Sequence, residues 1–390
     1  MRDPLSRKVV HIKPSGIRKF FDVVQEMPEA ISLGVGEPDF DTPWHVREEG
    51  IYALEHGRTF YTSNAGLLEL RQAIGRYIFR KYNLNYDPAT EMLITVGGSE
   101  GIDLALRAML DPGDEVILPL PAYVSYLPCI ELADGVPVTI DLQEKNRFKL
   151  TGEELMGTVT DRTKILILSY PNNPTGAIMT KEDLEPIAKI CVEKDLFVIS
   201  DEIYSELTYG ADHVSIASLP GMRERTVVIN GFSKAFAMTG WRLGYAFGPR
   251  LILEQMVKIH QFAIMCAPTN SQYAAVECMN NGEEDVQMMR TSYNQRRRYV
   301  MERFKEMGLK CFEPEGAFYL FPSVKEFGMS SEEFATRFLH EEKVAVVPGT
   351  AFGDCGEGFL RISYAYSIEE LKVALARLES FISKLRKEAF

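Results

Sequence analysis

The sequence lacks the features that commit a chain to binding a metal or to crossing a membrane. Its six cysteines and six histidines lie far apart and form no CxxC or close Cys/His pair, so we expect neither a metal site nor a disulfide framework. No run reaches the ~18 apolar residues that span a bilayer, and charges interrupt every apolar stretch near the N-terminus. We therefore expect a cytoplasmic protein with free, buried thiols.

Positive charge is also scarce. The chain has 43 Lys plus Arg against 55 Asp plus Glu, which gives a net charge of −12. An acidic surface repels nucleic acid and anionic lipid, so neither is expected as a partner, and small molecules remain. The hydrophobic fraction of 46% is that of a folded protein, and 390 residues suggest two or three domains at ~150 residues each.

Apolar runs alternate with amphipathic ones in the middle of the sequence. The apolar runs occupy residues 92–96, 115–119, 164–169, 197–200 and 226–230. Strands that are apolar on both faces and separated by helices are typical of a parallel sheet covered on both sides. The sequence therefore predicts an α/β fold with a mostly parallel central sheet flanked by helices.

The pattern changes after the apolar run at 244–248. A long helical region begins near Arg250, and shorter strand candidates and an amphipathic final helix follow it at 317–322, 344–348, 359–366 and 368–385. The basic triplet 296–298 is interpreted as the solvated side of the long helix. This mixture predicts a smaller α+β domain at the C-terminus.

The two predicted domains divide the chain unevenly. We expect a large domain over residues 45–285. The small domain is expected to be discontinuous, formed by residues 1–44 and 286–390, because an opening helix and loop precede the first strand of the sheet.

Glycine-rich and amide-rich loops follow two of the predicted strands, at the strand ends where ligands bind in α/β folds. Residues 97–99, Gly-Gly-Ser, open a helix whose free amides favour an anion, although for this motif alone a plain turn with Ser99 as the N-cap is the favoured interpretation. The turn YPNNPTG (170–176) contains two consecutive amides, which turn chemistry alone explains less well.

Charged groups follow two further strands. Asp201 ends one of them, with Tyr204 three residues later, and Lys234 follows another, with Arg242 eight residues later. Each of these alone could be a surface residue. Together, a reactive lysine, a carboxylate for a ring nitrogen, an amide and a phenol for a ring oxygen, and an anion cradle with an arginine describe a pyridoxal 5'-phosphate site.

Long motifs occur in a consistent order along nearly the whole chain, from Pro14 to Ser367. They are SLGVGEPDFDTP, VGGSEGIDLALRAMLDPGDEVILPLPAYVSY, SYPNNPTGA, VISDEIYSEL, GFSKAFAMTGWRLGY and VAVVPGTAFG. With these motifs the sequence resembles the class I/II aminotransferases of the aspartate aminotransferase superfamily, which have the type I fold of pyridoxal phosphate enzymes. The resemblance implies that cofactor and two half-reactions, one with an amino acid and one with a 2-oxo acid.

The resemblance also implies roles for residues around the cofactor ring. Lys234 corresponds to the lysine that binds the cofactor covalently and moves the proton of the substrate's α-carbon. Asp201 would pair with the ring nitrogen, and Tyr204 and Asn173 would hydrogen-bond the ring oxygen. Tyr123, in PAYVSY, corresponds to the aromatic residue that stacks on the ring.

Further residues correspond to the family's phosphate contacts. Gly98, Ser99 and Arg242 would hold the phosphate, and Ser233 is a further cofactor contact. Tyr61, in TFYTSNAG, corresponds to the tyrosine that reaches the phosphate of the partner subunit, so the resemblance implies a homodimer with shared sites.

Arg361, Gly36 and Asn173 correspond to the residues that bind the substrate. Arg361, in FLRISYAY, would hold the substrate carboxylate, although the alternation of the strand alone would place it on the solvent face. Two positions depart from the family pattern. Gly231 stands where some members have a phosphate-binding serine, so that hydroxyl contact is either missing or supplied by Ser233. Ser99 stands where a relative selective for acidic substrates has a lysine.

The nearest groups by overall resemblance are aromatic or alanine-type enzymes and N-acetyl-diaminopimelate aminotransferases. The stretch SGIRKFFD (15–22) favours this subgroup, whose N-terminal helix closes over the site. We therefore expect transfer from an L-amino acid of this kind, rather than clearly from aspartate, to an acceptor such as 2-oxoglutarate. A carbon–sulfur β-lyase is the alternative enzyme, and a cofactor-sensing transcription regulator with an added helix-turn-helix domain is the alternative from another class.

Overall fold

The computed structural model describes residues 2–12, 14, 16, 27 and 29–388. The stretch 15–22, which the resemblance expects to close over the site, therefore lies outside the described residues except for Gly16. Within the described ranges, no helix combines the length and the apolarity that crossing a membrane requires.

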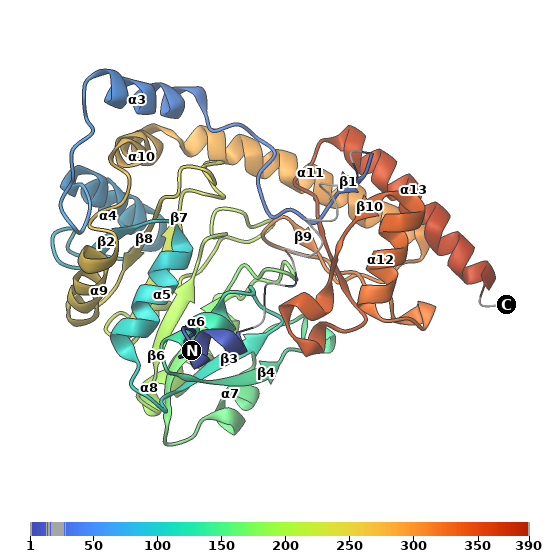
Figure 1. The fold of residues 1–390 in the computed structure, drawn as a ribbon, viewed down its shortest axis with the longest axis horizontal. Helices are drawn as coiled ribbons and strands as arrows, with labels where there is room; N and C mark the ends of the chain where they lie inside the picture. The colour runs from blue at the N-terminus through green and yellow to red at the C-terminus, as the bar shows by residue number, and fades with distance from the viewer. Residues whose placement is uncertain (1, 13, 15, 17–26, 28, 389–390) are drawn as a thin grey trace.

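A seven-stranded sheet forms the centre of the molecule (Figure 1), with the strand order β2-β8-β7-β6-β5-β3-β4. Six of these seven strands point the same way, and β8 points the opposite way between β2 and β7. In chain order the strands are β2 (Met92–Thr95), β3 (Glu115–Leu120), β4 (Val136–Asp141), β5 (Thr163–Ser169), β6 (Phe197–Asp201), β7 (Thr226–Gly231) and β8 (Gly244–Phe247). The predicted α/β fold with a mostly parallel sheet is thus confirmed.

Strand β4 was not predicted from the sequence. This strand pairs only with β3 at the edge of the sheet, and Val136, Thr139 and Asp141 are exposed along it. Pro137 interrupts its apolar pattern further, which is tolerated because an edge strand can leave one amide unpaired. The inner strands β3 and β7, and β2 at the other edge of the sheet, are buried along their whole length and are therefore clear apolar runs in the sequence.

Helices cover both faces of this sheet. They are α4 (Leu68–Tyr82), α5 (Gly98–Met109), α6 (Tyr126–Leu132), α7 (Gly152–Thr158), α8 (Lys181–Glu193), α9 (Arg250–Ala263) and α10 (Thr269–Asn281), while α3 (Trp44–Glu55) lies further out and packs against α10. Thr151 and Thr180 begin α7 and α8 with capping boxes, in which each threonine side chain accepts a backbone hydrogen bond and the side chain of the third helical residue accepts one in return. The short helix α1 (Arg7–His11) lies beside α6, where Lys8 pairs with Asp134 at 2.6 Å.

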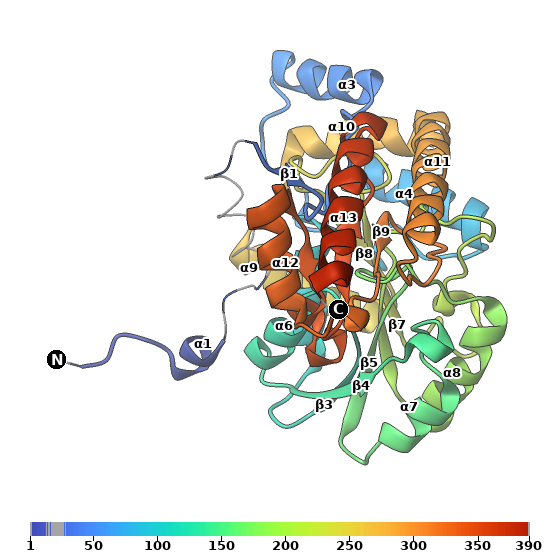
Figure 2. The same ribbon diagram turned by 90° about the vertical axis from the view of Figure 1, so that its right-hand side faces the viewer.

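A second group of elements lies beyond α10 (Figures 1 and 2). It contains α11 (Glu283–Met307), α12 (Ser331–Glu342), α13 (Ile368–Glu388), β1 (Ile31–Ser32), β9 (Tyr319–Leu320), β10 (Val344–Ala345), β11 (Val347–Pro348) and β12 (Leu360–Ser363). β1 pairs with β10, and β11, β12 and β9 form an antiparallel sheet. The N-terminal β1 therefore joins C-terminal elements. The exact domain boundaries stay a prediction, and the one after residue 285 falls in the first turn of α11.

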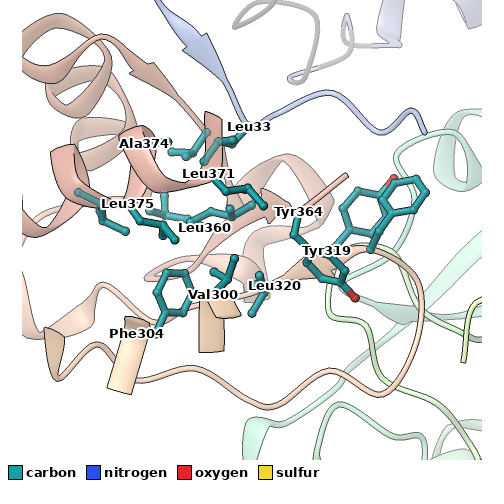
Figure 3. Close-up of a cluster of buried hydrophobic side chains, with 14 of the residues drawn as sticks. Leu33, Val300, Phe304, Tyr319, Leu320, Leu360, Tyr364, Leu371, Ala374 and Leu375 are labelled. Atoms are coloured by element: carbon teal, nitrogen blue, oxygen red, sulfur yellow. The ribbon is translucent and has the colours of Figure 1, made fainter. Parts of the chain in front are cut away.

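These C-terminal elements share one apolar core. Figure 3 shows side chains from α11, β9, β12 and α13 packed together with the N-terminal Leu33. Its labelled members are Leu33, Val300, Phe304, Tyr319, Leu320, Leu360, Tyr364, Leu371, Ala374 and Leu375. The core includes Leu33, three residues before Gly36, and Leu360 and Ile362, on either side of Arg361, so its packing helps to fix the positions of Gly36 and Arg361.

Two side-chain interpretations change with the structure. Arg296 and Arg297 do not lie on the solvated side of α11: Arg296 pairs with Asp39 at 2.7 Å, and Arg297 is buried, donating to Glu313 and to the Pro314 carbonyl. Local sequence gives no sign of these partners because they lie on other segments. All six cysteines are free, as expected, but only Cys191 and Cys278 are fully buried.

Candidate active site

Four loops meet at one edge of the central sheet. β5, β6 and β7 are parallel neighbours, so their carboxyl ends lie together. β2 ends at the same edge, because it is antiparallel to β8 and β8 is antiparallel to β7. The structure thus brings together residues 97–99 after β2, the turn 170–176 after β5, Asp201 at the end of β6 and Lys234 after β7.

Asp201 is buried at the end of the middle strand of this group, with 6% of its surface exposed. Its carboxylate accepts a hydrogen bond from the Tyr126 phenol at 2.7 Å and another from the Ile203 amide at 3.1 Å. Burial raises the pKa of Asp201, while these hydrogen bonds and the charge of Lys234 oppose that rise. A buried carboxylate in this position favours a ligand that brings a cationic N–H group.

Lys234 follows β7 and points its amine toward the N-terminal segment. Its Nζ donates to the Gly36 carbonyl at 2.6 Å and lies about 6 Å from the ring centres of Tyr204 and Phe318. Burial lowers the pKa of Lys234 to about 8, and although the charge of Glu37 opposes this shift, nearby arginines reinforce it. The amine is therefore available as a base or nucleophile near neutral pH.

An anion cradle forms where β2 meets α5. A Cβ on Gly244 would lie 2.6 Å from the Gly97 carbonyl carbon and 2.7 Å from the Gly98 amide nitrogen, so the backbones approach as only glycine allows. Arg242 places its guanidinium against Gly97 and donates to the Thr239 carbonyl at 3.0 Å. Free amides at the start of α5 beside a guanidinium form a suitable site for a phosphate.

The predicted phosphate residues lie around this cradle. Gly98 and Ser99 are the first two residues of α5, and Gly97 is the N-cap, so the alternative in which Ser99 caps the helix does not apply. A Cβ on Gly231 would lie 3.1 Å from the Gly244 Cα and 3.2 Å from the Leu243 carbonyl oxygen. This crowding gives a physical reason for glycine at 231. Ser233 is buried beside Lys234.

Arg361 is buried, with 3% of its surface exposed, and does not face solvent as the strand alternation alone suggests. Its guanidinium lies between two aromatic rings, 4.6 Å from the centre of Tyr319 and 4.8 Å from that of Phe352. It donates from Nη2 to the Gly34 carbonyl at 2.5 Å. Its Nε is buried and has no hydrogen-bond partner in the described part of the chain, which leaves a donor for a carboxylate ligand.

The two consecutive amides of the turn 170–176 have different partners. Asn172 accepts from the amide and the hydroxyl of Thr175, at 3.1 and 2.7 Å, and so shapes the turn. Asn173 accepts from Arg361 Nη1 at 2.9 Å through its Oδ1. Its Nδ2 group is thereby turned away from Arg361 and remains a donor for a ligand.

The remaining predicted residues differ in how close they lie to this centre. Tyr204 is buried near Lys234, Gly36 receives the Lys234 hydrogen bond, and Tyr123 packs edge-on against Tyr126 at 5.7 Å. Tyr61 is 80% exposed, and the single chain does not bring it to the other site residues by any described contact.

The structure adds three residues that were not predicted from the sequence. Tyr126 holds Asp201, Glu37 acts on the charge of Lys234, and Tyr319 lies 2.7 Å from Tyr204, oxygen to oxygen. Tyr126 lies in the motif PAYVSY, three residues after Tyr123, and that spacing was the available signal. Tyr319 occurs in a run that predicts only a strand.

Comparison with known proteins agrees with this site. The family model described as "Aminotransferase class I and II" matches residues 28–378. The chain is 53% identical to the "Putative aminotransferase YugH" of Bacillus subtilis, over 98% of this chain and 100% of that one. It is 47% identical to an "Aspartate aminotransferase" of Pyrococcus abyssi, over 97% and 98% of the two chains. The crystal structure of an aromatic aminotransferase from Pyrococcus horikoshii superposes with a TM-score of 0.90 at 46% identity, covering 94% of this chain and 99% of that one.

The close backbone approach at Gly244 generates a first prediction. Gly244→Ala should weaken the affinity for pyridoxal phosphate about tenfold or more, because overpacking costs about 1–3 kcal/mol and displaces the cradle. Gly240→Ala is the matched control, since a Cβ there meets nothing within 4 Å. Binding is measured by titrating the cofactor-free protein. Equal affinity in the two variants would contradict the cradle.

The environment of Lys234 generates a second prediction. In the cofactor-free protein, acylation of Lys234 should rise with pH around a midpoint of about 8, because only the unprotonated amine reacts. Glu37→Gln should move the midpoint lower by removing a charge that favours the protonated amine. Mass spectrometry of a digest measures both, with the exposed Lys305 as the internal reference. A midpoint above about 10, the ordinary value for a lysine, would contradict the assignment.

Proposed function

The chain belongs to the class I and II aminotransferases and is a pyridoxal phosphate-dependent enzyme, and from this premise we propose which of its residues perform the reaction and on which substrates. The observation that carries the proposal is the meeting of Asp201, Lys234 and Arg361 at one buried edge of the sheet. The Asp201 carboxylate suits a cationic ring nitrogen, the Lys234 amine suits an aldehyde, and the Arg361 guanidinium suits a carboxylate.

The residues present fit pyridoxal 5'-phosphate. The cradle of Gly98, Ser99 and Arg242 suits a phosphate, because backbones approach there too closely for any side chain at position 244. Ser233, which is buried next to Lys234 in the chain, would be a further contact of the cofactor. When bound, the cofactor supplies an aldehyde that accepts an amino group and a protonated ring that withdraws electrons.

Asp201 keeps the ring nitrogen protonated, since its buried carboxylate is stabilised by that cation. Tyr204 and Asn173 donate to the ring oxygen: burial holds the pKa of Tyr204 well above its usual range, so it stays a donor, and Asn173 has its Nδ2 free. Tyr123 would stack on the ring of the cofactor. Lys234 takes the proton from the substrate's α-carbon, which its lowered pKa permits near neutral pH.

Arg361 binds the α-carboxylate of the substrate. Its fixed, planar guanidinium, held between two rings and with a free Nε, suits bidentate recognition. Gly36 and Asn173 border the same space. Because both the amino acid and the 2-oxo acid carry this carboxylate, one arginine serves both half-reactions.

For the substrate, we favour an L-amino acid with an aromatic, alanine-like or similar side chain and an acceptor such as 2-oxoglutarate. Ser99, rather than a lysine, offers no dedicated cation to a second substrate carboxylate, so aspartate is not the favoured donor. Relatives with almost the same identity carry aspartate and aromatic-amino-acid names, and an N-acetyl-diaminopimelate substrate is the nearest variant of the proposal.

We also propose a homodimer, located in the cytoplasm. Phe60 and Tyr61 are about 80% exposed, and Phe262, on a neighbouring segment, is 85% exposed. Hydrogen bonds join these segments, from Asn64 to the Met265 carbonyl and from Thr269 to the Phe60 carbonyl. An apolar surface of this kind favours burial against a second copy, which would bring Tyr61 to the partner's phosphate cradle.

The reaction type and donor generate a third prediction. With 2-oxoglutarate or pyruvate as acceptor, aromatic or alanine-type donors should give stoichiometric keto acid and amino acid, followed through the absorbance of the cofactor. Lys234→Ala should lose both turnover and the absorbance of covalently attached cofactor. Retained turnover in that variant would contradict the role of Lys234, and ammonia with pyruvate released from cystathionine would identify a carbon–sulfur lyase instead.

The exposed Tyr61 generates a fourth prediction. Tyr61→Phe should weaken cofactor affinity about tenfold or more through loss of a hydrogen bond to a charged phosphate. Hybrids of Tyr61→Phe and Lys234→Ala chains should regain one native site, because the intact Lys234 then meets the intact Tyr61 of the other chain. If Tyr61 acts within its own chain, the hybrids will keep only a weakened site.

A further inference from the structure

Tyr319, on β9, is almost completely buried and contacts three of the proposed site residues. Its hydroxyl oxygen lies 2.7 Å from the hydroxyl oxygen of Tyr204, with the two rings edge to face at 78°. Its ring centre lies 4.6 Å from the guanidinium carbon of Arg361. The third contact is with Gly36. Figure 3 shows Tyr319 on the side of the apolar cluster away from the α13 side chains. One side chain therefore links the two sides of the site.

The direction of the hydrogen bond between the two phenols follows from proton counting. Each phenol has a single proton, and either oxygen could be the donor within this pair. If Tyr204 donates its one hydrogen bond to the ring oxygen of the cofactor, its oxygen can only accept a hydrogen bond from Tyr319. Hydrogen bonds in such a chain polarise one another, so Tyr319 strengthens Tyr204 as a donor.

Gly36 makes the space that this arrangement needs. A Cβ at position 36 would clash with the Tyr319 hydroxyl oxygen, so any other residue would push the phenol off Tyr204. The Gly36 carbonyl meanwhile accepts from Lys234 at 2.6 Å. Position 36 therefore needs a glycine for steric reasons, in addition to the hydrogen bond that its backbone carbonyl accepts.

The ring of Tyr319 acts on a different partner. Together with Phe352, it encloses the Arg361 guanidinium, whose Nη1 and Nη2 are fixed by Asn173 and by the Gly34 carbonyl. Cation–π contact with both rings holds the guanidinium plane without using its remaining Nε–H.

We propose that Tyr319 is a positioning residue with two separable tasks. Its hydroxyl orients the proton of Tyr204 toward the ring oxygen of the cofactor, and its ring holds Arg361 in the plane that receives the substrate carboxylate. The inference rests on the roles of Tyr204 and Arg361 in the proposed function. Tyr319 itself acts through these two residues.

The hydroxyl task is tested by Tyr319→Phe in the holoenzyme. Donors to the ring oxygen stabilise its negative charge and so favour loss of the proton shared with the lysine-bound nitrogen. Weakening Tyr204 should therefore raise the pH midpoint of the cofactor's visible absorbance change, by about half a unit to one unit. The KM values for donor and acceptor should stay unchanged, because the ring over Arg361 remains.

Tyr209→Phe is the matched control. Tyr209 is also buried in the same cluster, and its hydroxyl donates to the Ala317 carbonyl at 2.6 Å rather than to any site residue. A general loosening of the core by loss of a buried hydroxyl would move the absorbance midpoint in both variants, and that result would overturn the proposal. A shift in Tyr319→Phe alone supports it.

Tyr204→Phe separates failure of this inference from failure of the proposed function. If Tyr204→Phe raises the midpoint and Tyr319→Phe does not, the hydroxyl task is wrong while the role of Tyr204 stands. If neither variant raises it, the role of Tyr204 is itself wrong and the inference is overturned with it.

The ring task is tested by Tyr319→Leu. Losing one of the two cation–π contacts should raise the KM for both donor and acceptor, by about 2- to 30-fold relative to Tyr319→Phe. Equal KM values in the two variants would contradict the proposal that the Tyr319 ring holds Arg361 in place. Should the leucine variant fail to fold, Phe352→Leu removes the other ring from the same guanidinium and should raise both KM values without moving the absorbance midpoint.

Discussion

Asp201 ends the middle one of three parallel strands, and its carboxylate is almost entirely removed from water. Ionised carboxylates are costly to bury, and two donors from the chain, the Tyr126 phenol and the Ile203 amide, meet only part of that cost. We infer that the cationic ring nitrogen of the cofactor supplies the rest. In the proposed function, the roles of the other site groups are defined by that ring.

The location of the site follows from the sheet. Parallel strands bring their carboxyl ends to one edge, and the single antiparallel strand β8 returns β2 to the same edge. Glycines at 97 and 244 let the backbones of β2 and β8 come together closely enough to form the cradle. The small C-terminal elements add Arg361, on β12. In the proposed function the cradle binds the phosphate of the cofactor and Arg361 binds the carboxylate of the substrate.

The chain as a whole is acidic, whereas basic side chains gather at the site. The chain carries a net charge of −12, yet Lys234, Arg242 and Arg361 gather around the site. The mutual repulsion of these cations adds to burial in lowering the pKa of Lys234, which the proposed proton transfer requires. A cluster of cations at the site of an otherwise acidic chain suits small anionic substrates.

Much of the fold could be predicted from the sequence, because the inner strands are apolar on both faces and alternate with helices. The groups Asp201 and Lys234 were visible because they stand at or just after the ends of such strands. β4 was missed because half of it faces solvent at the sheet edge. The Tyr126–Asp201 and Tyr204–Tyr319 contacts join residues 75 and 115 positions apart, and no local pattern marks such a pair. The same reason explains why the interpretation of Arg296 and Arg297 as solvated was wrong.

The protonation state of the cofactor's ring nitrogen tests the central claim most directly. It can be measured by nitrogen-15 NMR after reconstitution with pyridoxal phosphate labelled at that nitrogen. We predict a protonated nitrogen throughout the neutral pH range in the native enzyme and an unprotonated one in Asp201→Ala. An unprotonated nitrogen in the native enzyme, or the same protonated signal in both proteins, would contradict the role of Asp201.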